Sequence, residues 1–209
     1  MQITVLGANG KVGRLVVRQL LESGYEVVAF VHRASSLPEH PKLKIIQGDI
    51  HSAAAIAQAV MGSTAVISTL GSWHTPDKDV LSSAIQHLVP AMRAQGIRRI
   101  VSLTGAGAFA SGDSPNVFDR FQHILMNAAA SKILRDSEEH IRLLSESDLD
   151  WTVVRSPVMN ERGKPRQFVL NNKRPSAWAT IHRQAVAASM IEQVESREHS
   201  RQAPFICRG

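Results

Sequence analysis

The chain alternates short apolar runs with longer stretches in which apolar residues recur every three or four positions. The short runs predict buried strands, and the longer stretches predict helices packed on them. We expect strands at residues 3–6, 26–31, 43–47, 65–69, 100–103, 151–155 and 205–207. Helices are expected from the first turn to Gly24 and at residues 52–60, 77–95, 118–144 and 185–194. Pro90 should kink the third of these helices, and the helix at 118–144 is expected to be interrupted. This order predicts an α/β fold, a doubly wound and mainly parallel sheet with helices on both faces.

The first expected strand runs directly into a glycine-rich turn, Gly7-Ala8-Asn9-Gly10-Lys11-Val12-Gly13. Such a turn between a strand and a helix lets backbone N–H groups close on a pyrophosphate, which the positive helix N-terminus also attracts. Gly13 is expected to let the helix pack closely. A phosphate-loop NTPase is excluded, because Val12 stands where that motif needs Ser or Thr. An ordinary strand–helix turn is the alternative, but the repeated strand–helix context favours dinucleotide binding by a single Rossmann-like domain over residues 1–209.

The end of the second strand indicates which dinucleotide is bound. An acidic residue about twenty positions after the glycine motif normally binds the adenosine ribose of NAD. His32-Arg33-Ala34-Ser35-Ser36 stands there instead, and a guanidinium and hydroxyls suit a 2′-phosphate. We therefore expect NADPH to be preferred, with NAD possible if Arg33 is only a solvated loop residue.

Other strand ends should line the same crevice, because ligands of such sheets bind at the carboxyl edge. Asp49 and Ile50 follow the third strand and could hold adenine, although Asp49 could equally be a turn or capping residue. Gly71 would let the backbone after the fourth strand approach a ligand closely. Residues after the fifth strand should line the nicotinamide half. The polar, basic and proline-flanked stretch 160–175 is expected to form a mobile flap over the substrate end.

The composition of the chain mainly argues against certain kinds of site and partner. The 209 residues contain no apolar run long enough to span a membrane, and we expect a cytoplasmic protein without a membrane partner. The single Cys207 cannot form an internal disulfide. The net charge of +6 comes from scattered residues, so we expect no nucleic-acid partner, and the nine isolated histidines predict no metal site.

Several motifs together resemble the atypical short-chain dehydrogenase/reductase superfamily, and the resemblance covers nearly the whole chain. They are GANGKVG at residues 7–13, the arginine after strand two, Gln47-Gly48-Asp49, Ser102-Leu103-Thr104-Gly105, and the stretch SDLDWTVVRSP at residues 147–157. The chain is most similar to the NAD(P)H-binding group of flavin reductases, and NmrA-like regulators are more distant. The resemblance implies an NADPH-dependent reductase acting on flavins or other planar conjugated molecules such as quinones and tetrapyrroles.

The resemblance also implies a set of cofactor-binding residues. Gly7, Asn9, Gly10, Lys11 and Val12 would hold the pyrophosphate, Arg33 and Ser36 the 2′-phosphate, and Asp49 and Ile50 the adenine. Leu70 and Gly71 would flank the nicotinamide ribose, while Leu103, Thr104 and Gly105 would lie beside the ring, closed by Pro157 and Val158. Two positions depart from flavin reductases, with Gly105 in place of a serine and Val158 in place of a histidine. The acceptor end would be formed by residues 105–130 and 156–180.

The catalytic residues are not identified by the sequence. A classical short-chain dehydrogenase uses a YxxxK pair as proton donor, yet the only tyrosine is Tyr25, expected far from the crevice. Ser102, Thr104, Lys132 and His140 are weak candidates, each with a structural alternative. A flavin can accept hydride without a protein acid. The leading hypothesis is therefore a reductase, monomeric or homodimeric. The alternative is a non-catalytic NADP(H)-sensing regulator, and an epimerase-like enzyme is disfavoured.

Overall fold

A computed structural model describes residues 1–34, 36–73, 75–165 and 167–209 of the chain. Its central sheet has the order β3-β2-β1-β4-β5-β6-β10-β8. The strands are β1 (Gln2–Leu6), β2 (Glu26–Val31), β3 (Leu43–Gln47), β4 (Ala65–Ser68), β5 (Arg99–Gly105), β6 (Asp150–Ser156), β8 (Val169–Asn171) and β10 (Phe205–Cys207). All neighbours pair in parallel except β8, which is antiparallel to β10. The predicted doubly wound, mainly parallel α/β fold is confirmed.

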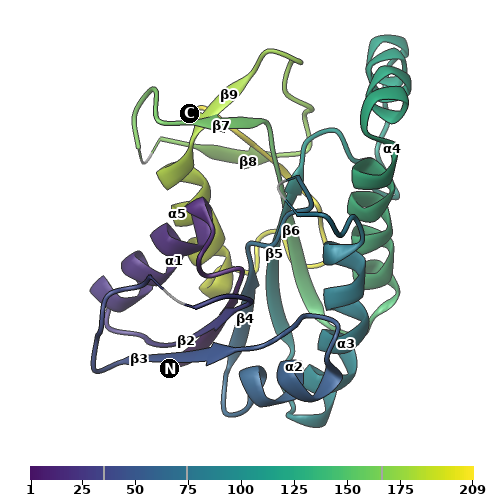
Figure 1. Cartoon of the computed structure of the whole chain (residues 1–209). Helices are drawn as coiled ribbons and strands as arrows, with labels where there is room; N and C mark the ends of the chain where they lie inside the picture. Colours follow the sequence, from purple (N-terminus) through teal and green to yellow (C-terminus); the bar gives the residue numbers. More distant parts are fainter. Residues whose placement is uncertain (35, 74, 166) are drawn as a thin grey trace.

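Helices cover both faces of this sheet (Figure 1). On one face lie α1 (Lys11–Glu22) and α5 (Arg183–Glu195), and on the other lie α2 (Ala53–Val60), α3 (Val80–Ala94) and α4 (Val117–Glu146). Each face of the sheet has its own apolar core, and successive residues of a strand point into opposite cores. Val101 belongs to the core under α1 and α5, and Ile100 to the core under α2, α3 and α4. The strand order reverses between β1 and β4, which places a crevice at their carboxyl ends.

Two helices bear on details expected from the sequence. Pro90 lies inside α3, which continues through it to Ala94. The interruption expected in the fourth helix is confirmed, because Ala130 has non-helical angles (φ −146°, ψ 44°) within α4. A capping box between Asn116 and Asp119 starts α4.

The stretch expected to form a mobile flap or insertion, residues 160–175, contains one complete strand and the end of another, and a third strand follows it; the sequence predicted none of the three. Val169–Asn171 forms β8, which joins the main sheet through Cys207 and its neighbours. β7 (Val158–Asn160) and β9 (Thr180–His182) form a separate parallel pair. Each of these three-residue strands includes a polar residue and pairs with a strand distant in sequence, so no apolar run marked it. That this stretch forms a mobile flap or insertion over the substrate end stays a prediction.

Candidate functional site

The glycine turn joins β1 to α1, and two of its glycines are required by the fold. Gly7 has φ +74°, and a Cβ on it would lie 3.0 Å from Thr69 Oγ1. A Cβ on Gly13 would lie 2.2 Å from the carbonyl oxygen of Gly7, so only glycine lets α1 begin directly against the turn. Gly10, at the helix N-cap, is less crowded, since its Cβ would meet only the Gly7 carbonyl at 3.1 Å.

The N-terminus of α1 is suited to an anion. Among the described residues, no side chain caps its first N–H groups, and its first turn has no acidic residue. These N–H groups form the positive end of the helix dipole. The side chain of Val12 is buried in the core beside that of Ala8, so only the backbone of Val12 is available to a phosphate.

The loop after β2 is hydrogen-bonded to the glycine turn. Asn9 Nδ2 donates to the carbonyl oxygens of Arg33 and Ala34, both at 3.3 Å. The Asn9 side chain, expected at the pyrophosphate, therefore holds this loop. The side chains of Arg33 and Ser36 are exposed beside it. Ser35, part of the same motif, lies outside the described residues.

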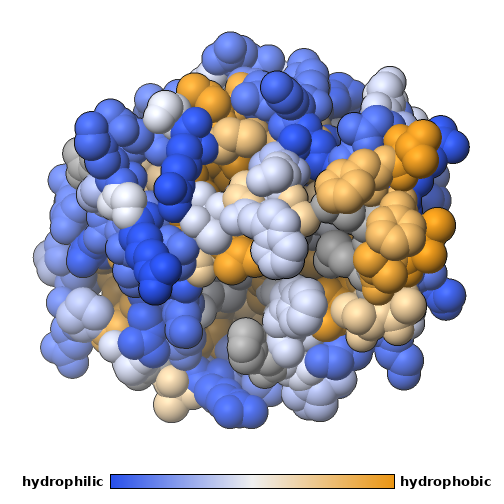
Figure 2. Space-filling model, turned by 90° about the horizontal axis from the view of Figure 1, so that it is seen from above, coloured by the Kyte–Doolittle hydropathy of each residue, from blue (hydrophilic) through white to orange (hydrophobic). Residues whose placement is uncertain are grey.

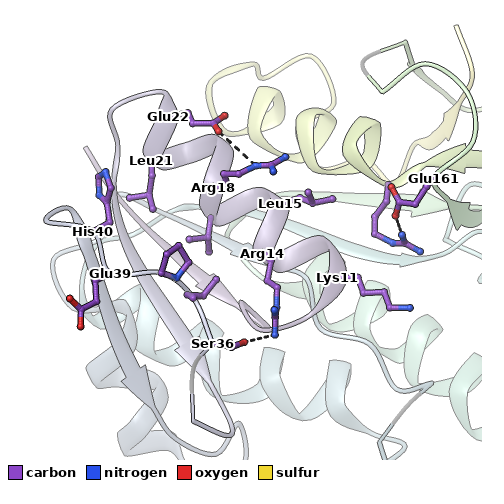
Figure 3. A pocket seen from close by; sticks show the side chains of 14 residues that line it. Lys11, Arg14, Leu15, Arg18, Leu21, Glu22, Ser36, Glu39, His40 and Glu161 are labelled. Atoms are coloured by element: carbon purple, nitrogen blue, oxygen red, sulfur yellow. Dashed lines mark hydrogen bonds and ion pairs between the residues drawn. The ribbon is translucent and has the colours of Figure 1, made fainter.

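Arg14 connects the glycine turn to the loop after β2 and was missed by the sequence analysis. Its Nε donates to the carbonyl oxygen of Asn9 at 2.9 Å, and its Nη2 donates to Ser36 Oγ at 2.5 Å (Figure 3). A helical side chain leans towards the helix N-terminus, so an arginine directly after Gly13 was the available signal. Arg14 borders a groove of about 780 Å³ between α1 and residues 36–40, where Lys11, Arg18 and Arg183 are also found.

Asp49, after the end of β3, stabilises the turn that follows it. Its Oδ1 accepts a hydrogen bond from the backbone N–H of His51 at 2.9 Å, which is the turn role weighed from the sequence. The carboxylate is exposed, and Ile50 is half-buried against the core. Both residues thus remain at the crevice edge where adenine is expected.

The part of the crevice expected to hold the nicotinamide, after β4 and β5, has open space at Gly71 and Gly105. A Cβ on Gly71 or on Gly105 would meet no atom within 4 Å. Leu70 is half-buried next to Gly71, whereas the Leu103 side chain is in the core. Pro157 is half-buried and Val158 is 67% exposed at the end of β6. This open edge and the uncapped helix N-terminus fit a dinucleotide laid across the strand ends.

The structure brings two of the four candidate catalytic residues together, but inside the protein. Ser102 Oγ lies 2.8 Å from His140 Nε2, and the two residues are 0% and 1% exposed. Burial lowers the pKa of His140 to about 4, although the charge of Asp136 opposes this shift. The Thr104 hydroxyl is buried without a partner among the described residues, and Lys132 is exposed on α4. The Ser102–His140 pair therefore stays neutral near pH 7.

Tyr25 lies at the opposite edge of the sheet from the glycine turn, because it precedes the amino end of β2. Its hydroxyl donates to Glu195, and this hydrogen bond, burial and the carboxylate charge raise its pKa. Tyr25 thus cannot serve as a proton donor at the crevice.

Two arginines hold the loop that follows β5. The buried Arg155 donates to the carbonyl oxygen of Ala108 at 3.2 Å and to Asp113 Oδ1 at 2.8 Å. Arg174 also approaches Asp113, at 3.6 Å. Burial by itself raises the pKa of Asp113, but hydrogen bonds from Arg155 and from the backbone N–H of Ala110, together with the charges of Arg155 and Arg174, lower this pKa overall. These contacts fix the loop after β5, which the sequence analysis expects at the acceptor end.

Neither metal ligands nor a membrane-spanning helix is found in the described parts of the chain. No group of three or more His, Cys, Asp or Glu residues there is arranged to hold a metal ion. No helix there is both long and apolar enough to cross a bilayer.

The model of the NAD(P)H-binding family matches residues 7–197, which include the glycine turn and the last crossover. The chain belongs to the NAD(P)H-binding family. This confirms the family resemblance deduced from the motifs.

Individual proteins that resemble this chain share a third or less of its residues over the aligned region. A 3-beta-hydroxysteroid dehydrogenase of Mycolicibacterium neoaurum is 33% identical over 48% of this chain and 31% of its own length. The chain thus spans about a third of the length of this curated relative. Two solved structures share the fold. One is a short-chain dehydrogenase/reductase of Veillonella parvula in complex with NADP (TM-score 0.78, 17% identity, 99% of this chain and 94% of that chain), and the other is the anaerobillin reductase ChuY of Escherichia coli O157:H7 (TM-score 0.78, 19% identity, 100% and 97%).

Proposed function

We propose that this protein is an NADPH-dependent oxidoreductase that passes hydride to a planar conjugated acceptor, with a flavin as the first acceptor to test. The observation that carries the proposal is the pairing of an uncapped helix N-terminus with Arg14 and Ser36 at one end of an open crevice. The family match supports NAD(P)H binding, and the NADP complex of the Veillonella protein supports the choice of cofactor.

The proposed cofactor contacts follow from this geometry. The backbone of Gly7, Gly10 and Lys11 would hold the pyrophosphate, and Arg14, Arg33 and Ser36 would hold the 2′-phosphate. Asp49 and Ile50 would contact adenine. The open space at Gly71 and Gly105 would receive the nicotinamide ribose and ring. When bound, NADPH supplies the hydride.

The chain's own contribution is to orient and shield the two rings. No YxxxK tyrosine is available, because Tyr25 lies at the other edge, and the Ser102–His140 pair is buried and neutral. An acceptor that needs no protein acid fits such a site, since a reduced flavin, quinone or tetrapyrrole can take its proton from water. Residues 105–130 and 156–180 of a single domain would form the acceptor end.

Thermal unfolding with NADPH and NADH, followed by NADPH oxidation with FMN, FAD, a quinone and biliverdin, tests the proposal. We expect a larger rise in melting temperature with NADPH and turnover with at least one acceptor. Saturating NADPH without a thermal shift would refute the cofactor assignment. A shift without oxidation by any acceptor would favour an NADP(H)-sensing regulator. The supporting observation is that Tyr25 lies away from the crevice and that Ser102 and His140 are buried.

A further inference from the structure

Asp136 is a buried acid on α4. It lies after the break at Ala130 and is 5% exposed. Burying a carboxylate costs free energy unless hydrogen-bond donors surround it, and four donors surround this one. Oδ1 accepts from the backbone N–H and the Oγ of Ser82, at 2.9 and 2.7 Å. Oδ2 accepts from the N–H of Leu81 at 3.1 Å and from Ser72 Oγ at 2.5 Å.

Two of these donors are backbone N–H groups in the first turn of α3. Among the described residues, the side chain of Asp79, the N-cap of α3, caps none of these groups, and a carboxylate from α4 takes its place. The positive end of the α3 dipole favours this carboxylate. The N-terminus of α3 is therefore occupied by a group of the protein itself, unlike that of α1.

The Ser72 hydroxyl comes from the segment between β4 and α3 and is not needed to cap the helix. Ser72 is 1% exposed, and Lys78 Nζ donates to its carbonyl oxygen at 3.1 Å. Ser72 is thus held at both its side chain and its backbone. Gly71, the residue before it, is exposed. An exposed glycine is therefore attached directly to a buried anchor.

The other end of this segment is fixed to the glycine turn. Thr69 Oγ1 donates to the last carbonyl oxygen of β1 at 2.9 Å and lies 3.2 Å from that of Gly7. Leu70 and Gly71 therefore lie between two fixed residues. Among the described residues, the backbone N–H of Gly71 donates to no backbone carbonyl, which leaves it available to a ligand.

The support beneath Gly71 belongs to the packed part of the fold. The half of α4 that carries Asp136 buries Leu134, Ile141 and Leu144 in the core, and α3 packs beside it (Figure 1). Figure 2, seen from above Figure 1, looks onto the side at which β5 and β6 end, where apolar surface is visible in hollows between polar side chains. Ligands of such sheets bind at the strand ends.

We propose that Asp136 is a positioning residue for the nicotinamide end of the cofactor and acts through Ser72. The inference rests on the proposed function, in which the space at Gly71 receives the nicotinamide ribose. The carboxylate holds the Ser72 hydroxyl, and Ser72 fixes the peptide of Gly71 that borders the ribose. A loop held in place before binding loses less conformational entropy when the ligand binds. The adenosine end, held by α1 and the loop after β2, does not depend on Asp136.

Calorimetric titration of NADPH and of adenosine 2′,5′-bisphosphate, which lacks the nicotinamide, tests this inference without turnover. Ser72→Ala removes one of the four donors and leaves the N–H groups of α3 capped. The dissociation constant of NADPH should rise roughly three- to tenfold, and that of the bisphosphate by less than about twofold. Asp136→Asn, which keeps the size of the side chain, should give the same pattern. Circular dichroism and urea unfolding check the fold of each variant.

Ser82→Ala is the matched control, because Ser82 Oγ donates to the same carboxylate at 2.7 Å but lies on α3. Its affinity for either ligand should stay within about twofold of that of the unsubstituted protein. Equal losses for the two ligands in Ser72→Ala, no loss there, or the same loss of NADPH affinity in Ser82→Ala would overturn the inference and leave the cofactor assignment intact. An unsubstituted protein that does not bind NADPH would refute the proposed function, and this inference with it.

Discussion

Replacing Arg14 with glutamine tests how the protein distinguishes NADPH from NADH. The guanidinium has five N–H donors, and its hydrogen bonds to the Asn9 carbonyl and to Ser36 Oγ leave others for a phosphate. A charge-assisted hydrogen bond to phosphate contributes about 1.5–3 kcal/mol. Because Arg14 lies at the surface, the lower half of this range applies, and the dissociation constant of NADPH should rise about tenfold to thirtyfold. That of NADH should rise less than about threefold.

The assay is a titration of each cofactor into the unsubstituted protein, Arg14→Gln and Arg18→Gln, at low and high salt. Arg18 is a matched control, because it lies one turn further along α1, borders the same groove and is paired with Glu22 at 3.7 Å. Arg18→Gln should change neither affinity by more than about twofold, and the selectivity for NADPH should shrink in high salt. Equal losses of NADPH and NADH affinity in Arg14→Gln, or equal losses in both variants, would refute a 2′-phosphate role for Arg14.

Three further outcomes are expected. Arg33→Asp should lower NADPH affinity much more than NADH affinity in the same titration, and equal losses would contradict a 2′-phosphate contact. Gly13→Ala should lower the free energy of unfolding in urea by about 1–3 kcal/mol, because its Cβ would lie 2.2 Å from the Gly7 carbonyl oxygen. Gly71→Ala, where a Cβ meets no atom, should weaken cofactor binding and change the free energy of unfolding by less than about 0.5 kcal/mol. The folded-state pKa of His140 is about 4 and its ordinary value is 6.5, so the unfolded chain binds more protons between them. The contribution of neutral His140 to the free energy of unfolding should thus be complete above pH 6.5 and fall by up to about 3 kcal/mol towards pH 4. Urea unfolding of His140→Gln should show a free energy that depends less on pH over this range. The same pH dependence in both proteins would contradict the lowered pKa of His140.

Local pattern was sufficient for most of the elements. Continuous apolar runs marked β1, β2, β4, β5 and β6, because strands of a parallel sheet are buried on both faces and need no alternation. Gly24 and Gly96 end the first and third helices with positive φ, as glycine beyond a helix commonly does. Strands β7, β8 and β9 were missed because each includes a polar residue, unlike the equally short but wholly apolar β10, and their pairing partners decide their conformation.

The sequence by itself determined the doubly wound fold and the glycine turn between β1 and α1, because both depend on local patterns of apolar residues and glycines. Only the tertiary structure decided which polar groups meet. Arg14 reaches Ser36 because α1 lies beside the loop after β2, and Ser102 meets His140 inside the core rather than at the crevice. Helical periodicity likewise predicted α4 but not its surroundings, since the same spacing of apolar residues buries Leu144 and exposes Phe118. Periodicity defines a face of an element, and only the packed neighbours decide whether that face is covered.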